Sequence, residues 1–250
     1  MQSTVTAIVP AFNEEKRIKN LLQTLLNYKE ITEILCVNDG STDNTGKIAE
    51  NLENIRVIHS EENFGKAHAI TKGLLEAKGD IVMFIDADLT GLKEEYISSL
   101  LHPLDDKSYD ASIGYRTNIL DKYMFMPLSG ERAYLKKDLI PHIAKLKNKG
   151  YGLELYLNYA FKDKRVKLLA LKGVKSSHKL RKQSYKIATK GIVDECGDVI
   201  NEIFSQKNPI TFFINAYIYP FYAKKSLKFA KKKFTAKYVY KTISDTIKHL

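Results

Sequence analysis

Two aspartates separated by one residue, Asp86 and Asp88, follow the strongly apolar run Ile81–Ile85. If the chain stays extended there, the two carboxylates project to the same side. Two like charges held together repel each other unless a cation or a hydrogen-bond donor compensates them. Hard oxygen ligands suit Mg²⁺ or Mn²⁺, which bind through one or two carboxylates and the phosphates of a substrate. The pattern predicts a metal and diphosphate site, and the alternative is a pair of solvated loop aspartates.

Two further polar clusters follow apolar runs earlier in the chain. They are Pro10–Glu15 and Asn38–Ser41. Ligands of open α/β sheets bind where the carboxyl ends of the strands meet, so we expect both clusters to lie beside Asp86. Asp39 and Gly40 by themselves are more typical of a simple turn, because Asp-Gly is a strong turn signal.

A third feature is the segment Asn63–Lys66, which stands at the start of an expected helix. Backbone N–H groups at a helix start and the Lys66 ammonium would both face an anion. Taken alone, the segment indicates only a loop that leads into a capped helix.

The elements that must position these residues are short β-rich runs that alternate with helical patterns over residues 1–115, which is typical of a mostly parallel α/β sheet flanked by helices. We expect the run at 81–85 to be the most central strand, and Asn13 to be the N-cap of the first helix. Expected strands are 5–10, 34–37, 55–58 and 81–85, and expected helices are 14–26, 43–52 and 66–77.

The second half of the chain has a less regular pattern. We expect a loop at 118–130, helices at 132–146, 153–161 and 185–204, and a β-rich run at 166–174 ahead of His178. No linker rich in glycine or serine separates the halves, so we predict one domain over residues 1–207. It would comprise a nucleotide-sugar half at 1–115 and an acceptor half at 116–207, followed by a basic, aromatic helical appendage at 208–250.

Composition excludes several classes of protein. The chain has 250 residues, 44% apolar, and no apolar stretch near the roughly 20 residues of a spanning helix. The amino terminus does not resemble a signal peptide, and two cysteines cannot form a disulfide framework, which favours the cytoplasm. The net charge of +11 is concentrated at the end, where residues 201–250 carry ten lysines against two acidic residues. A nucleic-acid-binding core is therefore not expected.

The motifs together resemble a known family. FNEE after the first strand, VNDGSTDNT after the second, N-x-G-K before a helix and the strand-DAD element resemble the family 2-like glycosyltransferases of GT-A fold, which use nucleotide-diphosphate sugars, over residues 4–115. PLSGERA, GYGLE and a G-V-x-x-x-H segment that ends at His178 are similar to the glucosyl-3-phosphoglycerate synthase and mannosylglycerate synthase type, whose members retain the anomeric configuration. The absence of tryptophan excludes the Q-x-x-R-W segment of processive polysaccharide synthases.

The resemblance implies roles for individual residues. His178 would join Asp88 on a Mg²⁺ or Mn²⁺ ion, with Asp86 beside it; by itself this histidine is more typical of an exposed loop. Glu154 would contact the donor sugar or the acceptor, and its alternative is a glutamate that stabilises a helix start. The residues implied for the nucleotide sugar are Pro10, Ala11, Glu14, Asp39, Gly40, Lys66, Asp86 and Ala87. Gly130, Glu131 and Arg132 are implied where sugar and acceptor meet, and Asp88, Glu154 and Arg132 would serve catalysis.

We therefore expect a metal-dependent transfer of a hexose from a uridine or guanosine diphosphate sugar to a small phosphorylated or hydroxy-acid acceptor, with retention favoured. One alternative is a polyprenyl-phosphate glycosyltransferase at the membrane surface, and another is a non-catalytic sugar-nucleotide-binding or scaffolding protein. The aromatic run Ile210–Tyr222 and the lysines after it favour contact with anionic lipid on the inner face of the membrane. A terminal helix packed on the domain or on a homodimer surface explains them equally well.

Overall fold

The computed structural model describes residues 3–117, 128–147, 149 and 152–176. The predicted appendage, the predicted helix at 185–204 and most of the predicted loop at 118–130 lie outside these residues, and the domain boundaries stay predictions. In the described part of the chain the strands are β1 (Val5–Ala11), β2 (Glu33–Asp39), β3 (Arg56–Ser60), β4 (Ile81–Phe84), β5 (Leu89–Thr90), β6 (Ala111–Arg116), β7 (Arg132–Leu135), β8 (Val166–Leu171) and β9 (Lys175–Ser176). The helices are α1 (Ile18–Leu26), α2 (Thr45–Glu50), α3 (Lys66–Glu76), α4 (Glu94–Asp105), α5 (Lys136–Leu139), the 3₁₀-helix η3 (Ile140–His142), α6 (Ile143–Leu146) and α7 (Leu153–Ala160).

Seven strands form one mostly parallel sheet in the order β3-β2-β1-β4-β7-β6-β8. The first four are parallel to one another, β7 is antiparallel to both β4 and β6, and β8 is parallel to β6. The prediction that the run at 81–85 is the most central strand is confirmed, because β4 is the fourth of the seven. Its residues Ile81–Phe84 are all buried, as an apolar strand covered on both faces must be.

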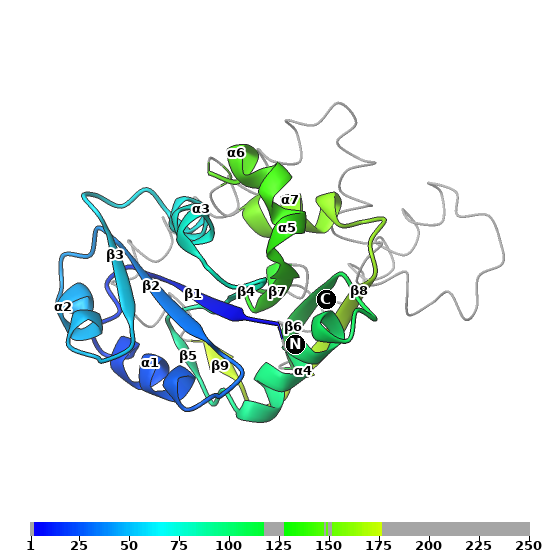
Figure 1. The fold of residues 1–250 in the computed structure, drawn as a ribbon. Coiled ribbons are helices and arrows are strands. Elements are labelled where there is room, and N and C mark those ends of the chain that lie inside the picture. Colours follow the sequence, from blue (N-terminus) through cyan, green and yellow to red (C-terminus); the bar gives the residue numbers. More distant parts are fainter. Residues whose placement is uncertain (1–2, 118–127, 148, 150–151, 177–250) are drawn as a thin grey trace, which may run out of the picture.

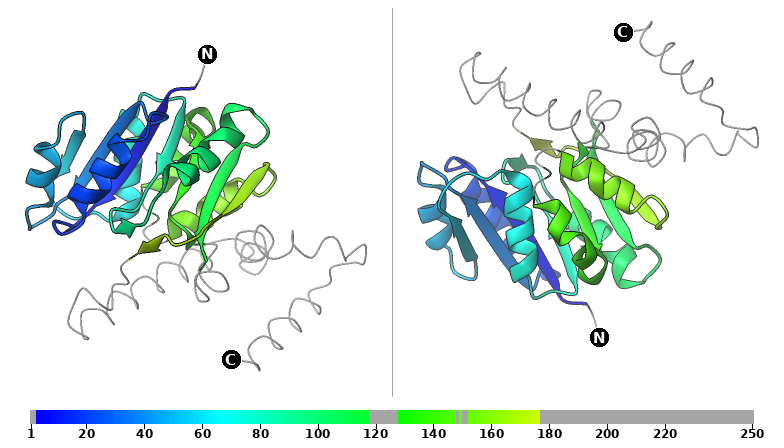
Figure 2. Two further views of the ribbon diagram at one scale, coloured as in Figure 1. Left: turned by 90° about the horizontal axis from the view of Figure 1, so that it is seen from below. Right: turned by 90° about the horizontal axis from the view of Figure 1, so that it is seen from above.

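Helices cover both faces of the sheet (Figure 1). On one face α1 and α4 pack against the core side chains of β1 and β4, and the short β5–β9 pair lies on this side. On the other face α3, α5, α6 and α7 pack against a second core (Figure 2). The apolar stripe of α1 explains its position, because Ile18, Leu21, Leu22 and Leu25 recur at helical spacing and all four are buried.

Two local predictions were wrong. Asn13 is not the N-cap of α1, which begins at Ile18 after Arg17; it adopts a left-handed φ of 54°, and its side-chain oxygen accepts a hydrogen bond from the backbone N–H of Thr42. The predicted helix over 132–146 is also wrong at its start, because residues 132–135 form β7. These four residues fill the space between β4 and β6, and this tertiary pairing outweighs the helical pattern that continues after them.

Candidate functional site

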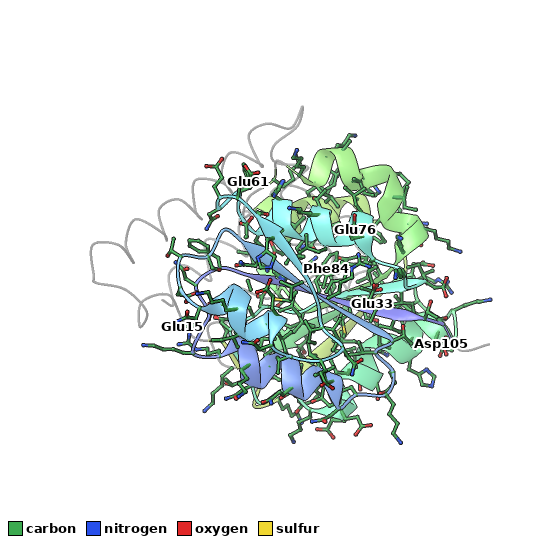
Figure 3. The ribbon with its side chains drawn as sticks, turned by 60° about the vertical axis from the view of Figure 1, so that its left-hand side comes forward. Glu15, Glu33, Glu61, Glu76, Phe84 and Asp105 are labelled. Carbon is green, nitrogen blue, oxygen red and sulfur yellow. The ribbon has the colours of Figure 1, made fainter. Side chains whose placement is uncertain are left out.

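The polar clusters predicted to meet do lie at one edge of the sheet. In the parallel register Ala11 of β1 is opposite Asn38 of β2, and Ile8 is opposite Phe84 of β4, so the segments that follow these strands leave the sheet together. Figure 3 shows the two ends of the molecule: Glu15 and Glu61, which follow β1 and β3, lie far from Glu33 and Asp105. The carboxyl edge therefore gathers residues 10–15, 38–41 and 86–88.

A partly buried ion cluster centres on Lys66, the first residue of α3. Its Nζ atom lies 2.6 Å from Oδ1 of Asp86 and 2.9 Å from Oε1 of Glu154. Burial would lower the pKa of Lys66, but the two carboxylates outweigh it and raise that pKa above its usual value. Burial would likewise raise the pKa of Asp86, and Lys66 together with Arg116 and Arg132 holds it below the usual range. Lys66 and Asp86 are consequently ionised at neutral pH.

Gly130 lies against this cluster without a side chain of its own. A Cβ atom at this position would stand 2.4 Å from Oδ2 of Asp86 and 2.6 Å from Nζ of Lys66. A side chain at this position would therefore displace the carboxylate of Asp86 and the ammonium of Lys66 from where they stand. The structure thus joins two predicted groups, the donor residues Lys66 and Asp86 and the acceptor residue Gly130.

Asp88 has a different partner from Asp86. The strand β4 ends at Phe84 and residues 87 and 88 form a turn, so the extended chain assumed for Asp86 and Asp88 is not what the structure has. Oδ2 of Asp88 accepts a hydrogen bond of 2.7 Å from the hydroxyl of Ser176, the last residue of β9, which pairs with β5. His178 lies outside the described residues, two positions after Ser176.

The donor chemistry at Asp88 fits a hard divalent cation. A carboxylate and a hydroxyl oxygen stand together there, and oxygen donors are the ligands that Mg²⁺ and Mn²⁺ prefer. Within the described ranges, no group of three or more histidine, cysteine, aspartate or glutamate side chains is close enough to hold a metal ion. The other ligand implied for the site, His178, lies outside the described residues.

Asp39 closes the loop that leads into α3. Its carboxylate accepts hydrogen bonds from the backbone N–H groups of Phe64 at 3.3 Å and Gly65 at 2.7 Å, and it is 3% exposed. Gly40 has a φ of 69°, and a Cβ atom there would overlap the backbone of Glu62. The turn interpretation of Asp39 and Gly40 therefore describes their local role, and the predicted contact of Asp39 with a base stays a prediction.

The segment after β1 is tied to the segment after β2. The backbone N–H of Glu14 donates to Oγ1 of Thr45 at 2.7 Å, and the Glu14 carboxylate pairs with Arg17 at 3.1 Å. Pro10 is half-buried, whereas Ala11 and Ala87 are 2% and 5% exposed. These contacts hold in place the residues that would line the predicted nucleoside site. The roles of these residues stay predictions.

Arg132 faces the interior. It is 1% exposed and donates to the backbone oxygen of Ser129 at 2.6 Å, to Oδ1 of Asn158 at 2.7 Å and to the hydroxyl of Tyr134 at 3.2 Å. Arg132 thereby cross-links β7 to α7, the helix that carries Glu154. Contact of Arg132 with a substrate stays a prediction.

Glu131 is fully buried, and neither carboxylate oxygen has a hydrogen-bond partner among the residues that the structure describes. Its carboxylate pairs with Arg116, whose Nη1 atom lies 3.7 Å from Oε1. Burial, followed by the charge of Asp86, raises the pKa of Glu131 to about 7, and the charges of Arg116 and Lys66 oppose this rise. Glu131 is thus the one acidic group of the predicted acceptor residues that titrates near neutrality.

Sequence reasoning missed Arg116, Asn158 and Ser176. The sequence did indicate Arg116, because it is the polar residue at the end of the β-rich run Ala111–Arg116. Asn38 and Asp86 stand at the ends of other apolar runs in the same way. No sequence pattern indicated Asn158 or Ser176, because their partners Arg132 and Asp88 are 26 and 88 residues away along the chain. In the described part of the chain, none of the helices has both the length and the apolar character needed to cross a bilayer.

Comparison with known sequences gives relatives that match part of the chain. An uncharacterised protein of Methanocaldococcus jannaschii is 36% identical over 149 residues, which are 56% of this chain and 62% of that protein. Dolichyl-phosphate β-glucosyltransferase of Trichomonas vaginalis is 40% identical over 100 residues, which are 35% of this chain and 31% of that protein. The 4,4'-diaponeurosporenoate glycosyltransferase of Staphylococcus aureus is 33% identical over 103 residues, 40% of this chain and 28% of that protein. The chain therefore spans less than two thirds of the length of these relatives.

Solved structures share the fold. Glucosyl-3-phosphoglycerate synthase of Mycobacterium tuberculosis, in complex with Mn²⁺, UDP and glucosyl-3-phosphoglycerate, superimposes with a TM-score of 0.65 at 21% identity over 81% of this chain and 79% of that chain. The same enzyme with Mg²⁺ and UDP gives a TM-score of 0.66 at 21% identity, again over 81% and 79% of the two chains. The predicted GT-A fold is confirmed. A family model described as glycosyl transferase family 2 matches residues 6–172, which is more than half of the chain, and the chain therefore belongs to glycosyl transferase family 2.

Proposed function

We propose that this protein transfers a hexose from a nucleotide-diphosphate sugar to a small phosphorylated or hydroxy-acid acceptor, with a divalent cation bound. The observation that carries the proposal is the contact between Asp88 and Ser176. It brings the chain that leads into His178 to the carboxyl edge of the sheet, beside the Lys66 ion cluster.

The donor is proposed to be a uridine or guanosine diphosphate sugar. In support, the segments after β1, β2 and β4 form one edge, which is where open α/β sheets bind nucleotides. The structural neighbours from M. tuberculosis are complexes with UDP or UDP-glucose. Pro10, Ala11 and Glu14 would line the nucleoside, Asp39 would face the base, and Lys66 would approach the phosphates.

Asp88 and His178 are the residues that would hold Mg²⁺ or Mn²⁺, with Asp86 orienting the donor. A bound divalent ion supplies Lewis-acid stabilisation of the charge that builds on the departing diphosphate. Ser176 fixes one oxygen of Asp88 through its hydrogen bond, so that carboxylate keeps one orientation. In support of a metal, neighbouring structures contain Mn²⁺ or Mg²⁺.

The Lys66 cluster would position the sugar. Lys66 compensates the charges of Asp86 and Glu154 in a site where unpaired carboxylates would repel a diphosphate. Because Glu154 is bonded to Lys66 and 6% exposed, it is a weak candidate for the base that an inverting reaction needs. This favours retention, in which the departing phosphate assists the incoming hydroxyl. Gly130, Glu131 and Arg132 would border the acceptor.

A lipid-linked acceptor, such as polyprenyl phosphate, is a second candidate. It is favoured by the dolichyl-phosphate β-glucosyltransferase relative, which matches this chain over 100 residues, and by the aromatic and lysine-rich sequence after residue 208. The protein would then act on the inner face of the membrane. A transfer assay with a radiolabelled sugar nucleotide and, in separate reactions, 3-phosphoglycerate, glycerate and polyprenyl phosphate identifies the acceptor by the labelled product.

The test of the proposed activity is the replacement Asp88→Ala. We expect it to abolish Mn²⁺-stimulated release of nucleoside diphosphate while the circular dichroism spectrum stays that of the wild type. Asp163→Ala removes an exposed aspartate from another surface and is the matched control, which should keep full activity. Wild-type protein that binds nucleotide but releases none at any metal concentration would instead support the non-catalytic alternative.

A further inference from the structure

The two-stranded sheet β5–β9 carries the contact between Ser176 and Asp88. β5 begins directly after Asp88 and β9 ends at Ser176, and the strands pair antiparallel with Leu89 opposite Ser176 and Thr90 opposite Lys175. Each strand is two residues long. An isolated two-stranded pair is at best marginally stable in water, so contacts with other elements must hold β9 beside β5.

The register of this pair decides whether the Ser176 hydroxyl reaches Asp88. Successive side chains of a strand point to opposite faces, so a slip of β9 by one residue would turn Ser176 away and bring Lys175 to its face. Leu89 and Val174 are buried in the core under α1 and α4, on the side of the sheet where the pair lies (Figure 1). Apolar burial is not directional, so these contacts hold the pair on the core without fixing its register.

Two tyrosine hydroxyls donate hydrogen bonds to the backbone next to this pair. Oη of Tyr96, in the first turn of α4, donates to the carbonyl oxygen of Lys172 at 2.5 Å, in the turn between β8 and β9. Oη of Tyr28, after α1, donates to the carbonyl oxygen of Leu92 at 2.9 Å, two residues after β5. Hydrogen bonds are directional, so each one restrains its strand along the direction of the chain.

The turn between β8 and β9 also lies against the chain that follows β5. Gly91 has a φ of 75° and Gly173 a φ of 80°, which is the left-handed region that favours glycine. A Cβ atom at Gly91 would stand 2.7 Å from the carbonyl oxygen of Gly173. This contact leaves the turn little room to move toward β5, and the hydrogen bond from Tyr96 opposes movement away from α4. Together they hold β9 at one position.

We propose that Tyr96 is a positioning residue that holds β9 in register with β5, so that the Ser176 hydroxyl fixes the Asp88 carboxylate for binding a divalent cation. Tyr96 acts through the Lys172 carbonyl and then through Ser176, and it is not itself a ligand of the cation. The inference rests on the proposed function, in which Asp88 holds Mg²⁺ or Mn²⁺. It gives a residue of α4, outside the site, a part in metal binding.

The test compares Tyr96→Phe, Ser176→Ala and the variant that combines them, all in the full chain. Phenylalanine keeps the ring of Tyr96 and removes only the hydroxyl. Electron paramagnetic resonance of free Mn²⁺ measures the dissociation constant of this ion. Hydrogen–deuterium exchange measures how fast the backbone amides of β5 and β9 exchange. Neither measurement depends on sugar transfer.

The matched control is Thr32→Val. Its hydroxyl likewise donates to a backbone oxygen, that of Val5 at 2.8 Å, but Thr32 precedes β2 at the amino edge of the sheet. The control should lower the resistance to urea, as Tyr96→Phe does, because both variants lose a hydrogen bond. It should leave the Mn²⁺ dissociation constant and the exchange of β5 and β9 unchanged. A loss of stability is thereby separated from a loss of positioning.

We expect Tyr96→Phe and Ser176→Ala each to raise the Mn²⁺ dissociation constant about fivefold, because both disturb the group that orients a metal ligand. The double variant should bind no more weakly than Ser176→Ala alone, because Tyr96 acts through Ser176. The amides of β5 and β9 should exchange faster in Tyr96→Phe than in the wild type.

Two results would overturn the inference. One is a wild-type Mn²⁺ dissociation constant in Tyr96→Phe; the other is a double variant in which the two losses multiply, since independent residues give that result. Wild-type protein that binds no Mn²⁺ would contradict the proposed function. Unchanged exchange in Tyr96→Phe would then overturn the inference too, whereas faster exchange would keep Tyr96 as the residue that positions Ser176 on Asp88.

Discussion

Replacing Lys66 with methionine removes the ammonium group at the centre of the ion cluster and keeps the length of the side chain. In the structure the Nζ atom contacts Asp86 at 2.6 Å and Glu154 at 2.9 Å. The side chains of these two residues are 25% and 7% exposed. The replacement leaves two carboxylates that repel each other in a place that water reaches poorly.

The expected loss follows from what buried ion pairs contribute. Removing one partner of such a pair costs about 3–5 kcal/mol, because the remaining charge stays buried without compensation. Lys66→Met should therefore lower the free energy of unfolding at pH 7 by about 4 kcal/mol, measured by urea denaturation. Asp86 can take up a proton in acid, so the difference between variant and wild type should shrink as the pH falls below 5.

Lys72→Met is the matched control, because Lys72 lies on the same helix α3 and its Nζ atom donates to the backbone oxygen of His59 at 2.6 Å. It loses this hydrogen bond and a longer one of 3.5 Å to the hydroxyl of Ser60, and it strands no carboxylate, so its cost should be about 1 kcal/mol. Adding Asp86→Asn to Lys66→Met should recover part of the stability. Equal losses in Lys66→Met and Lys72→Met, or a loss in Lys66→Met that is the same at pH 4 and pH 7, would refute the account of the cluster.

Three other changes give measurable results. Gly130→Ala places a Cβ atom 2.4 Å from Oδ2 of Asp86, and we expect it to lower the free energy of unfolding by about 1–3 kcal/mol, with loss of donor binding in calorimetry. Ser176→Ala removes the hydrogen bond to Asp88 and should weaken the Mn²⁺ affinity several-fold; unchanged affinity would remove Ser176 from the site. The pKa of Glu131 is raised to about 7, so its contribution favours folding in acid and is lost as the pH rises through 7. Between pH 4 and pH 8, the free energy of unfolding of the wild type, measured with urea, should fall by up to about 3 kcal/mol more than that of Glu131→Gln. Equal changes in the two proteins would contradict the raised pKa of Glu131.

Most of the first half of the fold could be predicted from the sequence. The apolar runs at 5–10, 34–37, 55–58 and 81–85 each correspond to a strand of the sheet, and the helical patterns between them correspond to α1, α2 and α3. Such patterns are reliable because a strand buried on both faces has to be apolar throughout, and a helix on a sheet has to be apolar along one stripe.

The errors lie where the local pattern and the tertiary environment disagree. Residues 132–135 precede a helical pattern, yet they form β7, because β4 and β6 leave a place for one antiparallel strand between them. Asn13 has the chemistry of an N-cap, but its side chain instead joins the segment after β1 to Thr42. In both cases the deciding partner lies far along the chain, where no local pattern indicates it.

The sequence by itself determined which polar segments meet, because in a parallel sheet the residues that follow each strand leave at the same edge. Tertiary structure alone decided which charges compensate each other there. The partners Lys66 and Glu154 are 88 residues apart, Asp88 and Ser176 are also 88 apart, and Gly130 reaches Asp86 only because β7 packs beside β4. The strength of a charge interaction depends on distances of a few ångströms and on burial, and neither quantity is fixed until the helices and strands pack together.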